Sequence, residues 1–163
     1  MKLAQRTRFI KPAILQAVTS KANKLKAQGH DVIGLGVGEP DFDTPRHIKD
    51  AAIQAVNNGH TKYTAVDGTP ALKQAVIEKF RRDNGLEYSP KQIIVSCGGK
   101  HSFFNIVQAT IDPGDEVIIP APYWASFPDI VALAGGVPVI VQTGIAQAFK
   151  ISATQLEQAI TPR

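Results

Sequence analysis

Two glycines and a lysine stand where a strand-like run meets a helix-like run, and this turn is the first candidate for chemistry. The segment reads Ile94-Val95-Ser96-Cys97-Gly98-Gly99-Lys100-His101. Free N–H groups at a helix N-terminus attract anions, and glycine lets the backbone approach a phosphate without a Cβ in the way. Lys100 adds a positive charge. The segment indicates either an anion site or a strand-to-helix turn without a ligand. It is not a P-loop, because the required glycine and lysine spacing is absent.

The only tryptophan follows the next predicted strand. Trp124 lies within Pro120-Ala121-Pro122-Tyr123-Trp124. Ligands of open α/β sheets bind outside the carboxyl ends of the strands, so Trp124 and the glycine turn can lie at the same edge of the sheet. The alternative is a purely structural role, in which Trp124 packs at the edge of the core. A phosphate at the turn and a flat ring beside Trp124 together suit a phosphorylated heteroaromatic cofactor.

Other reactive side chains are interpreted as structural. Cys97 could be a nucleophile, but no base is assigned to it and His101 lies a full helical turn on, which favours a buried structural cysteine. The four histidines show no metal-ligand spacing. Three acids, Glu39, Asp41 and Asp43, share a proline-containing loop without a partner that marks one of them as an acid or base. Glycines 34, 36 and 38 do not form G-x-G-x-x-G, which disfavours a nicotinamide-binding domain.

The elements that must position these residues alternate between strand and helix. Pro12, Thr44-Pro45 and Thr69-Pro70 begin three predicted helices, which end at Gly29, Asn57 and Asn84. A strand-like run covers residues 32–35. Buried strands are predicted at 93–95, 117–119 and 137–141, and they are separated by helices that end near residues 110 and 134. Ser152 and Gln155 form a capping box for a last helix. The pattern predicts an α/β fold with a parallel sheet covered by helices.

Composition is that of an ordinary soluble domain of 163 residues, with 44% apolar and 20% charged residues and a net charge of +4. A single cysteine excludes an intrachain disulfide and is compatible with a reducing compartment such as the cytoplasm. No run approaches the ~20 apolar residues of a membrane span. Residues 1–30 carry seven basic residues and no acid. A transit peptide or a nucleic-acid-binding arm could look like this, but a solvated helix face is favoured.

Several motifs together resemble class I aminotransferases of the aspartate aminotransferase type, closest to the bacterial aspartate and prephenate aminotransferases. Their order and separations match from about residue 5 to the end of the chain. They are Gly38-Glu39-Pro40-Asp41-Phe42-Asp43-Thr44-Pro45, Thr61-Lys62-Tyr63, Gly68-Thr69-Pro70-Ala71-Leu72, Gly98-Gly99-Lys100, Asp112-Pro113-Gly114-Asp115-Glu116-Val117 and Pro122-Tyr123-Trp124.

The resemblance implies part of a fold type I enzyme that uses pyridoxal 5′-phosphate (PLP). It implies an N-terminal arm and small-domain segment over residues 1–45, and over 46–163 the first part of the PLP-binding large domain, with the first half of its mostly parallel sheet. It also implies a homodimer with shared active sites, with an amino acid and a 2-oxo acid as substrates. Neither nucleic acid nor a membrane is expected as a partner.

The same resemblance assigns roles to individual residues. The turn at Gly98, Gly99 and Lys100 would bind the cofactor phosphate, and Trp124 would stack on the pyridine ring. Tyr63 would reach the phosphate of the partner subunit's cofactor. Gly38 would offer its backbone N–H near the substrate α-carboxylate. His101 stands where many relatives carry glutamine or alanine, so the resemblance assigns it no role.

The resemblance places the catalytic centre only partly within this chain. In the family, the lysine that holds PLP as a Schiff base lies beyond the position that matches residue 163, so no catalytic residue is assigned here and the chain alone is expected to be inactive. The parent reaction would transfer an amino group between aspartate or another dicarboxylate amino acid and a 2-oxo acid. Two other hypotheses stay open: a non-catalytic interaction module that retains half of the fold, and another fold type I enzyme such as a C–S lyase.

Overall fold

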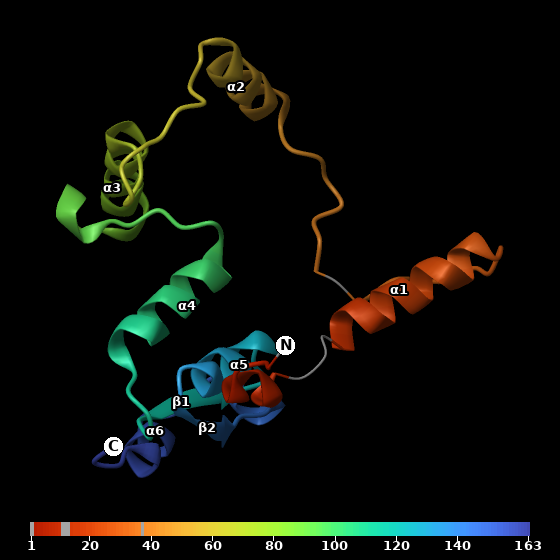
Figure 1. The fold of residues 1–163 in the computed structure, drawn as a ribbon, viewed down its shortest axis with the longest axis vertical. Helices are drawn as coiled ribbons and strands as arrows, with labels where there is room; N and C mark the ends of the chain where they lie inside the picture. The colour runs from red at the N-terminus through yellow and green to blue at the C-terminus, as the bar shows by residue number, and fades with distance from the viewer. Residues whose placement is uncertain (1, 11–13, 37) are drawn as a thin grey trace. The chain divides into compact units, whose positions relative to one another are not determined.

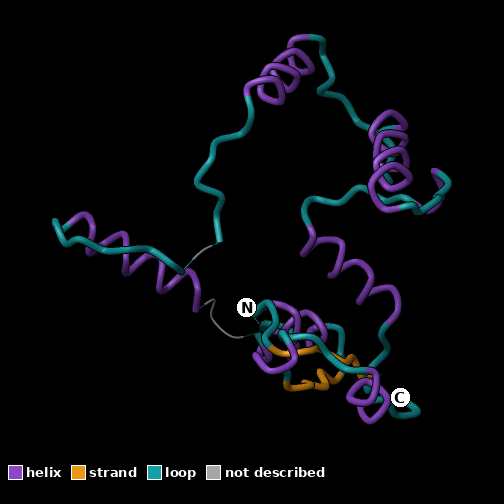
Figure 2. The backbone as a smooth tube through the Cα atoms, turned by 180° about the vertical axis from the view of Figure 1, so that it is seen from behind, coloured by secondary structure: helices purple, strands orange, loops and turns teal. Residues whose placement is uncertain are grey.

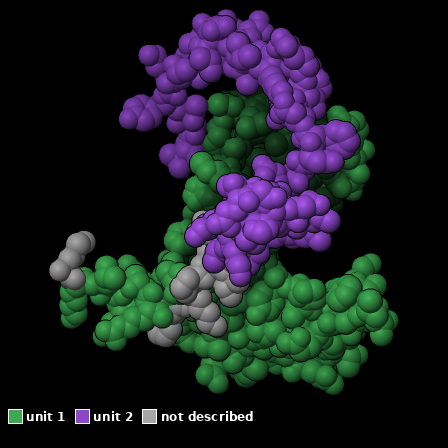
Figure 3. Space-filling view, turned by 90° about the vertical axis from the view of Figure 1, so that its right-hand side faces the viewer, with its two compact units in different colours: residues 1–11, 67–163 green, residues 12–66 purple. Residues whose placement is uncertain are grey.

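The computed structural model describes residues 2–10, 14–36 and 38–163 (Figure 1). The chain forms two compact units, which Figure 3 colours separately: residues 12–66 form one, and residues 1–11 with 67–163 form the other. The predicted division at residue 45, between a small-domain segment and a large-domain part, stays a prediction. None of the helices in the described ranges is long and apolar enough to cross a membrane.

In the unit of residues 12–66, helix α1 covers Ile14–Ala27 and helix α2 covers Arg46–Asn57. The predicted start of the first helix, at Pro12, lies outside the described residues. Its predicted end is confirmed, because Gly29 follows the helix with φ +85°, in the left-handed region that glycine tolerates. The strand-like run at 32–35 is not a strand. No strand in the described part of the chain pairs with its backbone, and Ile33 is exposed.

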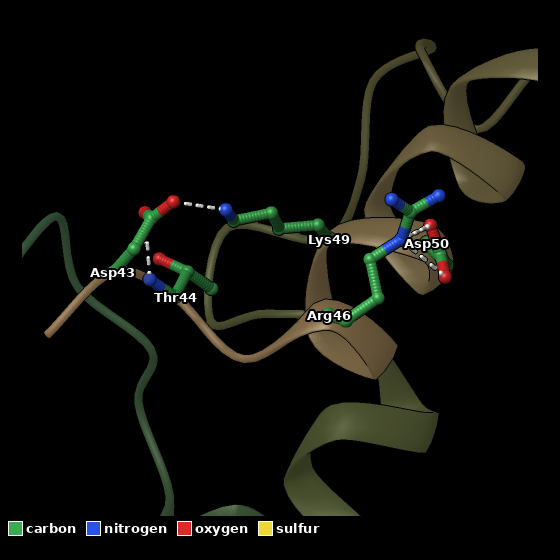
Figure 4. Close-up of polar contacts among 5 residues, drawn as sticks. All are labelled: Asp43, Thr44, Arg46, Lys49 and Asp50. Carbon is green, nitrogen blue, oxygen red and sulfur yellow. Dashed lines mark hydrogen bonds and ion pairs between the residues drawn. The ribbon is translucent and has the colours of Figure 1, made fainter.

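Helix α2 begins one residue later than predicted. Pro45 is the N-cap, and Thr44, the predicted cap, instead donates its backbone N–H to Asp43 Oδ1 at 2.8 Å. Asp43 also pairs with Lys49, as Figure 4 shows, and the hydrogen bond from Lys49 is the main reason that the pKa of Asp43 is lowered. One acid of the predicted cluster is therefore occupied by an ion pair. In the described residues, no group of three histidine, cysteine or acidic side chains could hold a metal.

The second unit begins with the 3-10 helix η1 (Gln5–Phe9), which packs against helix α5 (Ser126–Leu133). Helix α3 (Pro70–Asn84) then confirms both predicted end signals. Thr69 Oγ1 accepts the backbone N–H of Leu72 at 3.4 Å, and Gly85 ends the helix with φ +65°. The short 3-10 helix η2 (Pro90–Gln92) follows.

The strand predicted at residues 93–95 is absent. The run is extended, and Ile93 is buried while Ile94 is exposed, as in a strand. Its backbone forms no ladder in the described residues. Instead, the N–H of Val95 donates to the carbonyl oxygen of Asp67 at 3.1 Å. A β-branched apolar run specifies an extended conformation, but a strand also needs a neighbouring strand.

The predicted α/β class with a small parallel sheet is confirmed. Strands β1 (Glu116–Ala121) and β2 (Val137–Gln142) pair in parallel, with Glu116 opposite Val137 and Ala121 opposite Gln142 (Figure 2). Helix α5 connects the two strands. It begins at Ser126, after a loop over residues 122–125. Helix α6 (Ala153–Ala159) begins with the predicted capping box, in which Ser152 Oγ accepts the N–H of Gln155 at 3.1 Å.

The core of this unit lies between the sheet and two helices. Val107 of helix α4 (Gly99–Thr110), Ile119 of β1 and Val131 of α5 are buried against one another. Phe103 and Phe127 pack beside them, with ring centroids 4.7 Å apart. These contacts hold the start of α4 and the loop after β1 on one packed scaffold. The glycine turn and Trp124 lie on those two segments.

Candidate functional site

The turn before helix α4 leaves two backbone amides without partners. The Gly98 N–H donates to the Ser96 carbonyl oxygen at 2.8 Å, and the N–H groups of His101 and Ser102 both donate to the Gly98 carbonyl oxygen, at 3.1 and 3.3 Å. The next two amides, those of Gly99 and Lys100, have no hydrogen-bond acceptor among the described residues. These are the donors that a helix N-terminus offers to an anion.

The backbone of Gly98 shapes this turn. Gly98 is the N-cap of α4 with φ +89° and ψ 163°, a combination that is essentially restricted to glycine. A Cβ built on Gly99 would have no atom within 4 Å. The backbone of Gly99 is therefore open on its Cβ side, and the helix dipole adds partial positive charge at this turn. No acidic side chain lies in the first turn of α4 to compete for it.

Lys100 and Trp124 are brought together from two different segments. Lys100 belongs to the first turn of α4, and Trp124 belongs to the loop between β1 and α5. The Lys100 Nζ lies 5.1 Å from the centroid of the Trp124 ring, within the range of a cation–π contact. Trp124 is 43% exposed, so the indole is not buried as a filler at the edge of the core. A large part of the ring remains open to a ligand.

The sequence-based interpretation of Cys97 as a buried residue is wrong. Cys97 is a free and exposed thiol in the turn that precedes α4. Its backbone N–H donates to His101 Nδ1 at 3.1 Å. His101 therefore closes the turn from the first turn of α4. The sequence did not indicate this structural role for His101.

The loop that begins at Asp67 contacts the segment that leads into the Gly98 turn. The Asp67 carboxylate pairs with the ammonium of Lys73, whose side chain is buried, and this hydrogen bond is the main reason that the pKa of Asp67 is lowered. A Cβ on Gly68 would meet Val95 Cγ2 at 2.5 Å. Close packing at Gly68 and the Val95 hydrogen bond thus fix the segment that leads into Ser96. No local pattern reveals this support, since Asp67 and Val95 are far apart in sequence.

The remaining predicted site residues, Gly38 and Tyr63, belong to the unit formed by residues 12–66. Gly38 lies in a loop with no atom within 4 Å of a Cβ placed on it, and Tyr63 is fully exposed. Their predicted roles toward a substrate carboxylate and a partner's cofactor stay predictions. What the structure does assemble is a local site in the other unit: two free amides, one ammonium group and one half-exposed indole. This set of groups fits a phosphorylated flat ring.

The chain is similar to known proteins over its whole length. The family model for aminotransferase class I and II matches residues 30–163. An aspartate/prephenate aminotransferase of Nitrosomonas europaea is 68% identical over all 163 residues, which span 41% of that protein. An aspartate aminotransferase of Geobacillus stearothermophilus is 58% identical, and the chain spans 42% of it.

The fold agrees as well. The solved structure of the Thermus thermophilus aspartate aminotransferase with maleate matches with a TM-score of 0.95 at 48% identity, covering 100% of this chain and 43% of that chain. The chain thus spans about two fifths of the length of these relatives, and the resemblance seen in the motifs is confirmed. This chain belongs to the class I and II aminotransferase family.

Proposed function

We propose that this chain is the cofactor-anchoring part of an aminotransferase, and that it binds the phosphate and one ring face of PLP. The family is PLP-dependent. The observation that carries the proposal is the pair of amides at Gly99 and Lys100 that have no partner among the described residues, with Trp124 beside the Lys100 side chain. A phosphate needs donors and positive charge, and a pyridine ring needs a flat apolar face. In support of the proposal, both kinds of group lie on segments of one packed unit.

The residues of this chain would act by binding and orientation. The amides of Gly99 and Lys100 would hold two phosphate oxygens, and the Trp124 indole would lie against the ring. PLP supplies the electron sink for the chemistry at the amino acid Cα. The amide of Gly38 would bind the substrate carboxylate, and Tyr63 would reach the cofactor of a second subunit in a homodimer.

The parent reaction would transfer an amino group between aspartate or another dicarboxylate amino acid and a 2-oxo acid. Relatives that are aspartate or aspartate/prephenate aminotransferases support this substrate class. The lysine that anchors the cofactor covalently would come from polypeptide beyond the position of residue 163. The chain would therefore bind PLP but would not catalyse transamination by itself.

Binding can be tested on the chain directly. PLP is titrated into the protein while the fluorescence of Trp124 is followed, and pyridoxal without the phosphate serves as the matched ligand control. We expect saturable quenching by PLP and much weaker quenching by pyridoxal. Equal affinities would contradict the phosphate role of the turn. Borohydride reduction of the complex should give no stoichiometric adduct, and one lysine modified in full yield would contradict the assignment of the anchoring lysine to another segment.

The activity of the parent enzyme needs a second experiment. Residues 1–163 can replace the matching segment of the Thermus thermophilus aspartate aminotransferase, because the two match with a TM-score of 0.95. We expect the chimera to transfer the amino group of aspartate to a 2-oxo acid. A folded chimera that binds PLP but only eliminates sulfide from cysteine would favour a C–S lyase. A folded chimera that binds no PLP would favour a non-catalytic module.

A further inference from the structure

Lys100 carries a side chain whose charge is poorly placed for the helix that bears it. It lies in the first turn of α4, where the positive end of the helix dipole disfavours a cation. Among the described residues it forms no ion pair that would compensate. In the part of the chain that the structure describes, its side chain makes one specific interaction, with the indole of Trp124, 5.1 Å from Nζ to the ring centroid. A negative ring face offsets the unfavourable position of the ammonium group.

Among the described residues, the ring of Trp124 makes no hydrogen bond or ring contact besides the one with Lys100. The Trp124 carbonyl oxygen accepts the N–H of Phe127 at 3.0 Å, but the indole N–H has no acceptor among the described residues. The residue lies in a loop and is 43% exposed. Without a hydrogen bond or full burial, such a side chain can exchange between rotamers. The contact with Lys100 is the specific interaction that restricts it.

We propose that Lys100 is a positioning residue that holds the Trp124 indole at a set orientation beside the anion turn. The same residue provides one of the two free amides, so its backbone defines the anion position and its side chain defines the ring position. One residue would thereby set the distance between the two subsites. That the oriented indole receives a cofactor ring rests on the proposed function, whereas the orientation itself does not.

A single tryptophan makes the proposal measurable, because all indole emission from the chain comes from Trp124. Three variants are compared with the wild type. Lys100→Met keeps the length and apolar stem of the side chain but removes the charge, and Lys100→Arg restores a cation. Lys79→Met is the matched control, since Lys79 lies 5.5 Å from the Phe80 ring and makes the same kind of contact away from Trp124.

The readouts are the fluorescence anisotropy of Trp124 and its quenching by acrylamide, with circular dichroism as the check on folding. A cation–π contact at an exposed site corresponds to a change of about two- to fivefold in the population of the held orientation. We therefore expect lower anisotropy and stronger quenching in Lys100→Met, wild-type values in Lys79→Met, and recovery in Lys100→Arg. Should Lys100→Met not fold, Lys100→Gln gives the same comparison.

The proposal is overturned if the folded Lys100→Met variant matches the wild type in both readouts, or if Lys79→Met changes them equally. A PLP titration of the same proteins tests the proposed function separately. Failure of PLP to bind the wild type would remove the proposed function and leave the orientation result intact. If PLP binds, weaker quenching of Trp124 in Lys100→Met at saturation would support the positioning role. Identical quenching and identical affinity would contradict it.

Discussion

The backbone of Gly98 allows the sharpest prediction about the anion turn. With φ +89° and ψ 163°, this residue occupies a region that is essentially restricted to glycine, and a side chain there costs about 1–3 kcal/mol. In Gly98→Ala this cost has one of two consequences. Either the turn keeps its shape and the free energy of unfolding falls by this amount, or the turn relaxes and the amides of Gly99 and Lys100 no longer converge.

The second outcome has a measurable size. A cost of about 1–3 kcal/mol corresponds to a loss of roughly 5- to 150-fold in PLP affinity. The assay combines urea unfolding of the ligand-free chain with a PLP titration followed by Trp124 fluorescence. Gly144→Ala is the matched control, because Gly144 is extended, with φ −144°, and a Cβ there meets no atom within 4 Å. We expect the control to change neither quantity.

The reasoning is refuted if Gly98→Ala retains both the stability and the PLP affinity of the wild type. It is also refuted if Gly144→Ala weakens PLP binding as much as Gly98→Ala does. If Gly98→Ala lowers the free energy of unfolding but leaves the PLP affinity unchanged, the turn has kept its strained shape. The two measurements together show whether the alanine lowers the free energy of unfolding or the affinity for PLP.

Three further predictions concern stability, measured by urea unfolding. In Asp67→Asn the ion pair with Lys73 is lost. Because the hydrogen bond from Lys73 lowers the pKa of Asp67 in the folded chain, the stabilisation is present above the ordinary carboxyl pKa and is lost as pH falls through the lowered pKa. The difference between wild type and variant should therefore be full at neutral pH and shrink in strong acid. Val131→Ala should cost about 1.5–3 kcal/mol, since Val131 is fully buried. Ser152→Ala should cost about 1 kcal/mol through loss of the N-cap hydrogen bond to Gln155.

Each of these has an outcome that would contradict it. A difference between the wild type and Asp67→Asn that persists unchanged in strong acid would exclude the ion pair as its cause. A negligible effect of Val131→Ala would mean that the core between the sheet and helix α5 is not tightly packed. If Ser152→Thr, which keeps the hydroxyl, destabilises as much as Ser152→Ala, the hydroxyl hydrogen bond is not the source of the effect.

Local signals in the sequence determined the helix ends well. The stop at Gly29, the cap at Thr69 and the capping box at Ser152 each depend on residues within one turn of each other. Their physical basis is the need to satisfy the free backbone groups at a helix terminus, which a nearby side chain or a glycine can do alone. The alternation of apolar runs and helices likewise indicated the α/β class and the parallel pair β1 and β2.

The candidate site was visible in the sequence as types of residue but not as an arrangement. Gly98, Lys100 and Trp124 could be selected from their motifs, and the family resemblance named their roles. Only the tertiary structure decided that Cys97 is exposed and that the run at 93–95 is extended without a strand partner. Both depend on what lies beside the segment, and hydropathy does not encode that.

The contact between Lys100 and Trp124 is also a product of the fold, because the two residues come from different elements and meet only when helix α4 and strand β1 pack on the same core. The support of the turn by Asp67 and Gly68 has the same origin. Sequence determined which groups could bind a phosphate and a flat ring, since that follows from residue type and local backbone geometry. The fold decided which of these groups lie within reach of one another, since that depends on packing between segments distant in the chain.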